Sequence, residues 1–311
     1  MPAVLSITAP IFLLIAIGYL AVKSRLLAPE AVPGLGRFVL YFALPAAIFS
    51  TVSRMNFGEI IDPSFVGVYA TASLCSFTLG LLFSLYVLRN GLGAAGLKGI
   101  GMAIPNSMFI GYPVLLQVFG DPPANAFAMA VMVENIVVLP LALIAIEYGS
   151  GNRADKRLSE VWASVFGRVI RNPIIQSITA GLAASAIGLQ LPGAVDQSLD
   201  MLARASAATA LFVIGGSLVG TPIRGELKEI SPVVIGKLLI HPLLVALMLW
   251  LLPPFDPELE LAALLIAAMP MMSIYPIIGG NYGYGSQCAS ILILTTALSF
   301  VTVTVLLAFV T

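Results

Sequence analysis

The sequence contains few charged residues, two cysteines and a single histidine. Charged residues make up 10% of its 311 residues, whereas soluble domains carry about a quarter. This is little polar surface for a protein in water, and the zero net charge argues against a nucleic-acid partner. Cys75 and Cys288 lie in apolar runs, and His241 is the one histidine, so the usual ligands of a zinc site are lacking. We therefore expect no metal and no cofactor.

Long apolar runs dominate the sequence instead. Hydrophobic residues make up 59% of the chain, and the mean hydropathy is +1.03. A membrane-spanning helix needs about 20 predominantly apolar residues. Ten runs of this kind cover approximately residues 4–22, 34–53, 65–88, 99–119, 124–147, 172–191, 198–219, 231–252, 259–281 and 286–309. We predict an all-α polytopic membrane protein with ten transmembrane helices.

Basic residues are distributed unequally between alternate links. Twelve of the 15 lie in the links after spans 1, 3, 5 and 7. Arg54 and Arg204 lie on the opposite side, and Lys237 lies within a span. Because cytoplasmic loops are enriched in Lys and Arg, those four links are predicted to be cytoplasmic and both termini to lie outside the cytoplasm.

The longest link, residues 149–171, is markedly polar and lies at the middle of the chain. It separates a first five-helix repeat, residues 1–148, from a second, residues 172–311. Because each repeat has an odd number of spans, the second repeat would be inverted in the membrane relative to the first. Inverted repeats are common in secondary transporters.

Spans 4 and 9 are both interrupted by prolines. Span 4 contains I-P-N-S-M-F-I-G-Y-P-V-L-L from Ile104, and span 9 contains M-P-M-M-S-I-Y-P-I-I-G-G-N-Y-G from Met269. Proline removes a backbone donor and clashes with the preceding turn, so both helices should break. Broken backbone is tolerated at membrane depth only where it lines a cavity or is buried in protein.

Two breaks at matching positions of the two halves indicate a transporter's midplane site. The N-terminal ends of the resulting half-helices carry partial positive charge and free donors, which suit an anion. The alternative interpretation is a pair of proline kinks that serve packing alone.

The stretch N-S-M-F-I-G-Y-P from Asn106 to Pro113 resembles the Asn-x-x-x-x-Gly-x-Pro stretch in the fourth helix of the auxin efflux carrier family. The resemblance covers the whole chain. It implies the fold of the bile-acid sodium symporters, with crossing helices 4 and 9, a homodimer and elevator-type alternating access. Helices 1, 2, 6 and 7 would form the scaffold domain, and helices 3–5 and 8–10 the transport domain.

The sequence Ile274-Tyr275-Pro276 and the short central link are similar to the bacterial dicarboxylate branch of that family, which implies the bacterial inner membrane. The family often has an asparagine near the helix 9 prolines, and here the nearest amide is Asn281. The breaks and the resemblance together give these candidate substrate-binding residues: Asn106, Ser107, Gly111, Pro113, Pro270, Ser273, Tyr275, Pro276 and Asn281.

Three further polar residues inside spans are candidates for proton coupling or for support of the site. Glu134 and Asn135 lie in span 5, where an ionisable side chain is costly and functional by default. The alternative for Glu134 is a packed carboxyl group satisfied by its neighbours. Lys237 lies one helical turn from His241 in span 8. We favour the interpretation that its side chain extends to the cytoplasmic edge of the membrane.

Enzyme signatures are absent from the sequence, which has neither His-Glu-x-x-His nor a phosphate-binding loop. We predict a secondary active carrier of a small organic anion, a dicarboxylate such as malonate. The alternatives are a non-transporting membrane sensor or scaffold, and a carrier of an auxin-like aromatic monocarboxylate.

Two expectations concern coupling and assembly. Glu134 is the carboxylate nearest mid-membrane, so a sodium site is poorly supplied with ligands, and we expect proton coupling or uncoupled exchange. For the homodimer, span 2 with Leu44-Pro45 and span 7 with its Gly215-Gly216 pair offer apolar surfaces.

Overall fold

The computed structural model describes residues 2–55, 60–120, 123–149, 166–167, 170–220 and 226–310. Most of the predicted cytoplasmic link, residues 149–171, lies outside the described residues. Within them, the chain is helical, and its β-structure is a single isolated bridge between Pro105 and Met271. The predicted all-α class is confirmed for this part of the chain.

Short π-helical turns, labelled η, alternate with α-helices along the chain. The first half contains α1 (Pro2–Lys23), α2 (Ala31–Phe38), η1 (Val39–Ala43), α3 (Leu44–Arg54), α4 (Pro63–Tyr86), α5 (Leu92–Ala103), η3 (Ser107–Gly111), α6 (Tyr112–Phe119), α7 (Ala124–Met132), η4 (Val133–Val138) and α8 (Leu139–Gly149). The second half contains α10 (Pro173–Ala186), α11 (Gly193–Ser217), α12 (Leu227–Ile235), η5 (Gly236–Ile240), α13 (His241–Leu251), α14 (Pro257–Ala268), α15 (Tyr275–Gly280) and α16 (Gly285–Val310).

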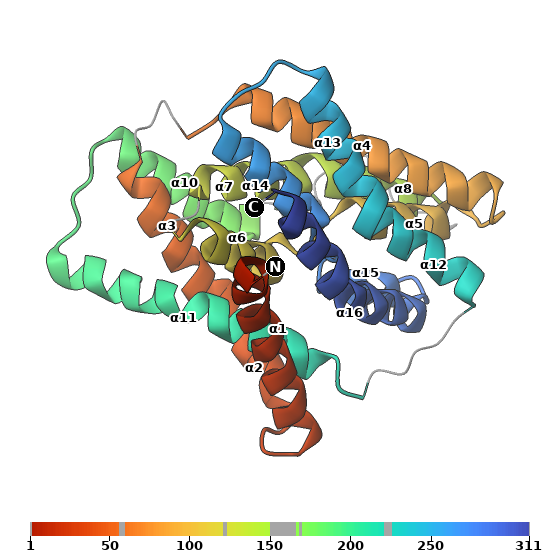
Figure 1. Ribbon diagram of the computed structural model, residues 1–311, viewed down its shortest axis with the longest axis horizontal. Helices are drawn as coiled ribbons and strands as arrows, with labels where there is room; N and C mark the ends of the chain where they lie inside the picture. Colours follow the sequence, from red (N-terminus) through yellow and green to blue (C-terminus); the bar gives the residue numbers. More distant parts are fainter. Residues whose placement is uncertain are drawn as a thin grey trace.

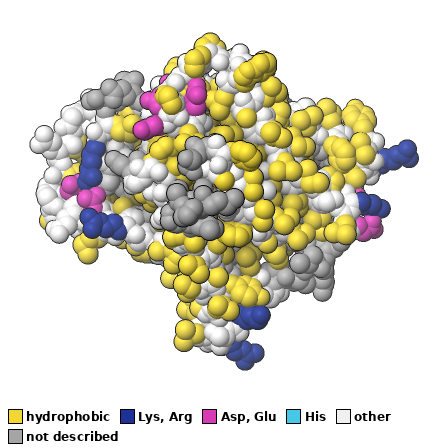
Figure 2. Space-filling model, viewed as in Figure 1, with side chains coloured by type: hydrophobic (Ala, Val, Ile, Leu, Met, Phe, Trp, Pro, Cys, Tyr) yellow, Lys and Arg dark blue, Asp and Glu magenta, His cyan; other side chains and the backbone are white. Residues whose placement is uncertain are grey.

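Six continuous helices of the described chain are long and apolar enough to cross a membrane. They are Ala31–Arg54, Pro63–Tyr86, Ala124–Gly149, Gly193–Ser217, Leu227–Leu251 and Gly285–Phe309. The other predicted spans coincide with α1, of which Ala9–Lys23 is the apolar part, with α10 and with the two interrupted segments, so the count of ten stays a prediction. Figure 2 shows a face covered largely by hydrophobic side chains, with charged side chains towards its margins. Such a surface suits a lipid environment.

Every π-helical turn in the described residues ends two residues before a proline. The prolines are Pro45 after η1, Pro113 after η3, Pro140 after η4 and Pro242 after η5. A proline ring clashes with the carbonyl of the preceding turn and leaves it without a donor. A locally widened turn relieves that clash without ending the helix, and such π-bulges occur frequently at functional sites.

One group of helices contains α1, α3, α10 and α11. Helix α11 packs along α1 and α3, and α10 packs on α3 (Figure 1). Glycines bring α1 and α11 into backbone contact, because a Cβ atom added at Gly215 would lie 1.8 Å from the carbonyl oxygen of Ile15. Gly216 likewise faces Val22 and Val32 of the same chain. These two glycines therefore pack within the chain, and the contribution of span 7 to a homodimer stays a prediction.

The second group contains α4, α5, α8 and the helices from α12 to α16. Helix α4 packs on α5 and α13, α5 packs on α8, and α16 packs on α12 and α15. In Figure 1 this group lies on the opposite side of the molecule from α3, α10 and α11, with α6 and α7 between them. The interrupted segments therefore lie where the two groups meet.

Candidate functional site

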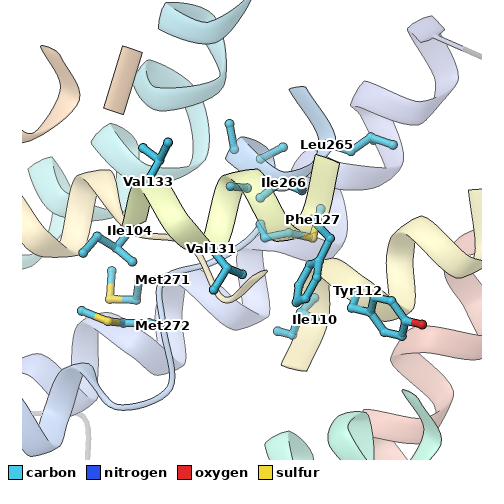
Figure 3. Packing of buried hydrophobic residues seen from close by; sticks show 14 of the residues in the cluster. Ile104, Ile110, Tyr112, Phe127, Val131, Val133, Leu265, Ile266, Met271 and Met272 are labelled. Atoms are coloured by element: carbon cyan, nitrogen blue, oxygen red, sulfur yellow. The ribbon is translucent and has the colours of Figure 1, made fainter. Parts of the chain in front are cut away.

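The two interrupted segments pair through their backbones. The amide of Asn106 donates to the Pro270 carbonyl at 2.7 Å, and the amide of Met272 donates to the Ile104 carbonyl at 3.2 Å. Ile104, Met271 and Met272 lie side by side in Figure 3. Each break thus satisfies backbone groups of the other, which makes irregular backbone tolerable inside a membrane protein.

Asn106 connects the two breaks through its side chain as well. Its Oδ1 accepts a hydrogen bond from the Phe109 amide at 3.2 Å and so caps the start of η3. Its Nδ2 donates to the Ser273 hydroxyl at 2.7 Å, across to the second break. The residue is 3% exposed, so both bonds lie away from bulk water.

A cavity of about 280 Å³ lies beside the paired breaks. Its walls come from both breaks, from the π-helical turns η1 and η4, and from the start of α10. The lining residues are Leu40, Tyr41, Ile104, Pro105, Asn106, Ser107, Met108, Phe109, Glu134, Asn135, Leu139, Arg171, Asn172, Pro173, Met272, Ser273 and Ile274. Glu134 and Arg171 are the charged members of this set.

The Glu134 carboxyl group is buried and held by two hydroxyl groups. Tyr69 on α4 donates to its Oε1 at 2.8 Å, and Ser107 in the first break donates to the same atom at 2.6 Å. Glu134 is therefore bonded directly to the break. Both donors remain suitable whether the group is a carboxylate or an acid protonated on Oε2.

Asn135, the next residue of η4, links the second helix group to α10. Its Nδ2 donates to the Val131 carbonyl at 2.9 Å, and its Oδ1 accepts from Asn172 Nδ2 at 3.2 Å. Asn172 also caps α10, because its Oδ1 accepts from the Ile174 amide at 2.9 Å. The N-terminus of α10 and the preceding Arg171 are thereby fixed beside the cavity.

Lys237 lies fully buried in η5, so the predicted extension to the membrane edge is wrong. Its ammonium group donates to the Ala267 carbonyl at 2.9 Å and lies 2.7 Å from His241 Nδ1. Helix α14 ends one residue after Ala267, and the last carbonyls of a helix have no partner within it. Lys237 therefore satisfies a carbonyl that the second break leaves open.

A polar chain continues from Lys237 towards the cavity. His241 Nε2 lies 3.1 Å from the Ser73 hydroxyl, and its ring packs near that of Tyr69, which bonds Glu134. Lys237 lies outside the cavity lining and contacts the site through these neighbours.

Comparison with known proteins identifies the family. A family profile described as "Membrane transport protein" matches residues 3–307. The chain belongs to this family. It is a family of membrane transporters that includes the auxin efflux carriers, as the N-S-M-F-I-G-Y-P stretch indicated.

Three relatives show the range of this transporter family. A Rhizobium meliloti (strain 1021) protein, provisionally named a malonate transporter, is 31% identical over 99% of this chain and 96% of its own length. The lysosomal cholesterol signaling protein of Mus musculus is 26% identical over 89% of this chain, which spans 33% of that protein. Auxin efflux carrier component 8 of Arabidopsis thaliana is 18% identical over 68% of this chain and 71% of its own length.

In this transporter, five of the predicted site residues line the cavity together: Asn106, Ser107, Glu134, Asn135 and Ser273. They come from both breaks and from η4, as the matching interruptions and the resemblance suggested. Their role in binding stays a prediction.

Other predicted residues hold the breaks and do not line the cavity. The Gly111 amide donates to the Asn106 carbonyl at 2.9 Å, and Pro113 lies in the first turn of α6. Pro270 supplies the carbonyl that pairs with Asn106, and Pro276 lies in the first turn of α15. These positions shape the breaks through the backbone.

Tyr275 and Asn281 lie away from the cavity lining. Tyr275 is buried, with its hydroxyl facing Gly101 and Cys288. Asn281 is exposed just after α15, beyond the second break. The amide that bonds across the break is Asn106, and the distance of Asn281 from the second break along the chain already argues against it.

The sequence-based predictions do not include the residues at the start of α10 that line the cavity. Counting charges treats Arg171 as a loop cation and gives no weight to Asn172. The triplet Arg171-Asn172-Pro173 carries a usable signal, because Asn followed by Pro is typical of a helix N-terminus. Leu40 and Tyr41 are ordinary apolar residues of a span, and nothing in the sequence distinguishes them.

Proposed function

We propose that this transporter is a secondary active carrier of a small organic anion, most closely a dicarboxylate such as malonate. The observation that carries the proposal is the cavity beside two paired helix breaks, lined by amide and hydroxyl groups from both. The relative named as a malonate transporter supports the substrate class, because similarity extends over almost the full length of both chains.

The chemistry of the cavity suits a carboxylate. Asn106 and Ser107 lie at the start of η3, where helix amides and the local dipole favour negative charge. Ser273 adds a hydroxyl group from the opposite break. The volume of about 280 Å³ is sufficient for a short dicarboxylate.

We further propose ten transmembrane helices arranged as two inverted five-helix repeats, with crossing helices 4 and 9. The paired breaks after α5 and α14 support this arrangement, since they occupy equivalent places in the two halves. In this proposal the group of α1, α3, α10 and α11 is the scaffold domain, the other group with α6 and α7 is the transport domain, and relative sliding of the two would give elevator-type access. A bacterial inner membrane, external termini and a homodimer complete the proposal.

Proton coupling through Glu134 is our proposal for the driving force. Glu134 is the acidic residue of the cavity lining and is bonded to the first break through Ser107. A sodium site would need several oxygen ligands, which one carboxylate already engaged with two hydroxyl groups supplies poorly.

A membrane sensor of an organic molecule is the rival function. The similarity to the lysosomal cholesterol signaling protein favours it, although this chain spans only 33% of that protein. A sensor binds its ligand without net movement across the membrane, so transport distinguishes the two.

Uptake into proteoliposomes tests the proposal directly. Purified protein is reconstituted, and labelled mono- and dicarboxylates are offered with a sodium gradient or a pH gradient imposed separately. We expect uptake of malonate-like anions that depends on the pH gradient and needs no sodium. Binding without uptake would identify a sensor, and uptake restricted to aromatic monocarboxylates would refute the dicarboxylate assignment.

A further inference from the structure

Arg171 is a cation on the wall of the proposed substrate cavity, contributed by the residue just before the cap of α10. The break residues that we assign to the substrate carboxylate are uncharged. A short dicarboxylate carries a second negative charge that amides and hydroxyl groups match weakly. Among the cavity-lining residues, Arg171 is the one with a positive charge to meet it.

We propose that Arg171 binds the second carboxylate of the substrate and so determines selectivity for dicarboxylates over monocarboxylates. This inference rests on the proposed function, in which one carboxylate lies at the breaks beside Asn106. Guanidinium groups suit the task because their planar fork binds a carboxylate through two parallel hydrogen bonds.

Among the described residues, no carboxylate pairs with Arg171. The ion pairs formed among the described residues involve Arg54, Lys98 and Lys228, and none involves Arg171. Glu134, the acidic group of the same cavity, is bonded to Tyr69 and Ser107 instead. Arg171 is exposed, so water solvates its guanidinium group in the absence of substrate. A substrate carboxylate that binds the group would replace this water.

The backbone that carries Arg171 is held in place. Asn172 caps α10 through its Oδ1 and bonds Asn135 of η4 through its Nδ2. Pro173 lies in the first turn of α10, where its fixed φ suits the helix start. These contacts hold the backbone of Arg171 in place relative to η4 and α10.

A pair of ligands with one charge difference tests the inference. Malonate and its monoamide, malonamate, have nearly the same shape, but malonamate has a single carboxylate. Equilibrium binding of each is measured by calorimetry on the full chain in nanodiscs. We expect wild-type protein to prefer malonate by at least about ten-fold, since bonds to charged groups are the stronger ones.

Arg171→Gln should weaken malonate binding by about ten- to one-hundred-fold and change malonamate binding by less than about three-fold. Arg171→Lys keeps the charge without the fork and should lose less than Arg171→Gln. The control is Arg89→Gln, which removes an exposed cation outside the cavity lining and should leave both affinities unchanged.

Several results would overturn the inference. They are unchanged malonate binding in Arg171→Gln, equal weakening of both ligands, equal loss in the Lys and Gln variants, or a wild-type protein that binds both ligands equally. The comparison of malonate with malonamate binding to wild-type protein tests the inference even if a variant does not fold. Failure of the proposed function has another signature, because wild-type protein would then bind neither malonate nor malonamate.

Discussion

Replacing Glu134 by glutamine separates substrate binding from its coupling to protons. The Glu134 Oε1 atom accepts hydrogen bonds from Tyr69 at 2.8 Å and from Ser107 at 2.6 Å. A glutamine amide has the same size and an oxygen that accepts both bonds, so the cavity wall should persist. The amide cannot take up or release a proton, and that loss is the perturbation of interest.

The expected magnitude follows from the driving force. A pH difference of about one unit stores about 1.4 kcal/mol per proton, which is a concentration ratio of about ten. Wild-type protein that moves one proton with each substrate should therefore concentrate malonate by up to about ten-fold under that gradient. Glu134→Gln should show no accumulation, while exchange of labelled for unlabelled malonate continues.

The assay compares accumulation and exchange in the same proteoliposomes, with acid outside and voltage clamped by valinomycin and potassium. The control is Glu147→Gln, because Glu147 also accepts a tyrosine hydrogen bond, from Tyr282 at 2.9 Å, but lies outside the cavity lining. It should retain accumulation. The reasoning is refuted if Glu134→Gln still concentrates malonate like wild type, or if wild type exchanges malonate without accumulating it.

The same contacts lead to three further predictions. Asn106→Ala should weaken malonate binding by about ten- to one-hundred-fold. Asn106→Asp should weaken it by more, because Asp keeps the cap on the Phe109 amide but places a negative charge at the site. Calorimetry on variants with wild-type melting temperatures checks both. Gly215→Val should destabilise the protein by about 1–3 kcal/mol or more, because the larger side chain forces α11 away from the Ile15 carbonyl. The control Gly193→Ala, on the same helix with open space around it, should not destabilise the protein. Thermal unfolding in detergent measures both effects. The homodimer predicts native mass spectra with two 32.6 kDa chains, and a monomeric mass in mild detergents and nanodiscs would contradict it.

The sequence predicts where the helices break, but it cannot predict how the breaks are satisfied. Two prolines per segment are enough to indicate an interruption, because the effect of proline on a helix is local. The bond between Asn106 and Ser273 joins residues 167 positions apart, and only the folded chain brings them together. Asn281 is the nearest amide to the helix 9 prolines, but it lies exposed after α15 and outside the cavity lining.

The predicted positions of the Lys237 and Arg171 side chains both differ from the structure. The position of Lys237 near a span end predicts a side chain at the membrane edge, but the open carbonyl of Ala267 holds it inside. The position of Arg171 in a link predicts an ordinary loop cation, but the cap formed by Asn172 places it beside the cavity. Counting charges along a chain predicts a side of the membrane and cannot predict the partner of each charge.

The position of the cavity between two helix groups bears on how transport would proceed. One wall carries Arg171 and Asn172 at the start of α10, and the other carries the breaks and η4. If the groups slide past each other, the bond between Asn172 and Asn135 must break, at a net cost of about 0.5–1.5 kcal/mol. The bonds that hold Glu134 and Asn106 lie within the second group and would move with it. A substrate bridging from the breaks to Arg171 would connect the groups, so its release from Arg171 would be the step that frees the second group to move.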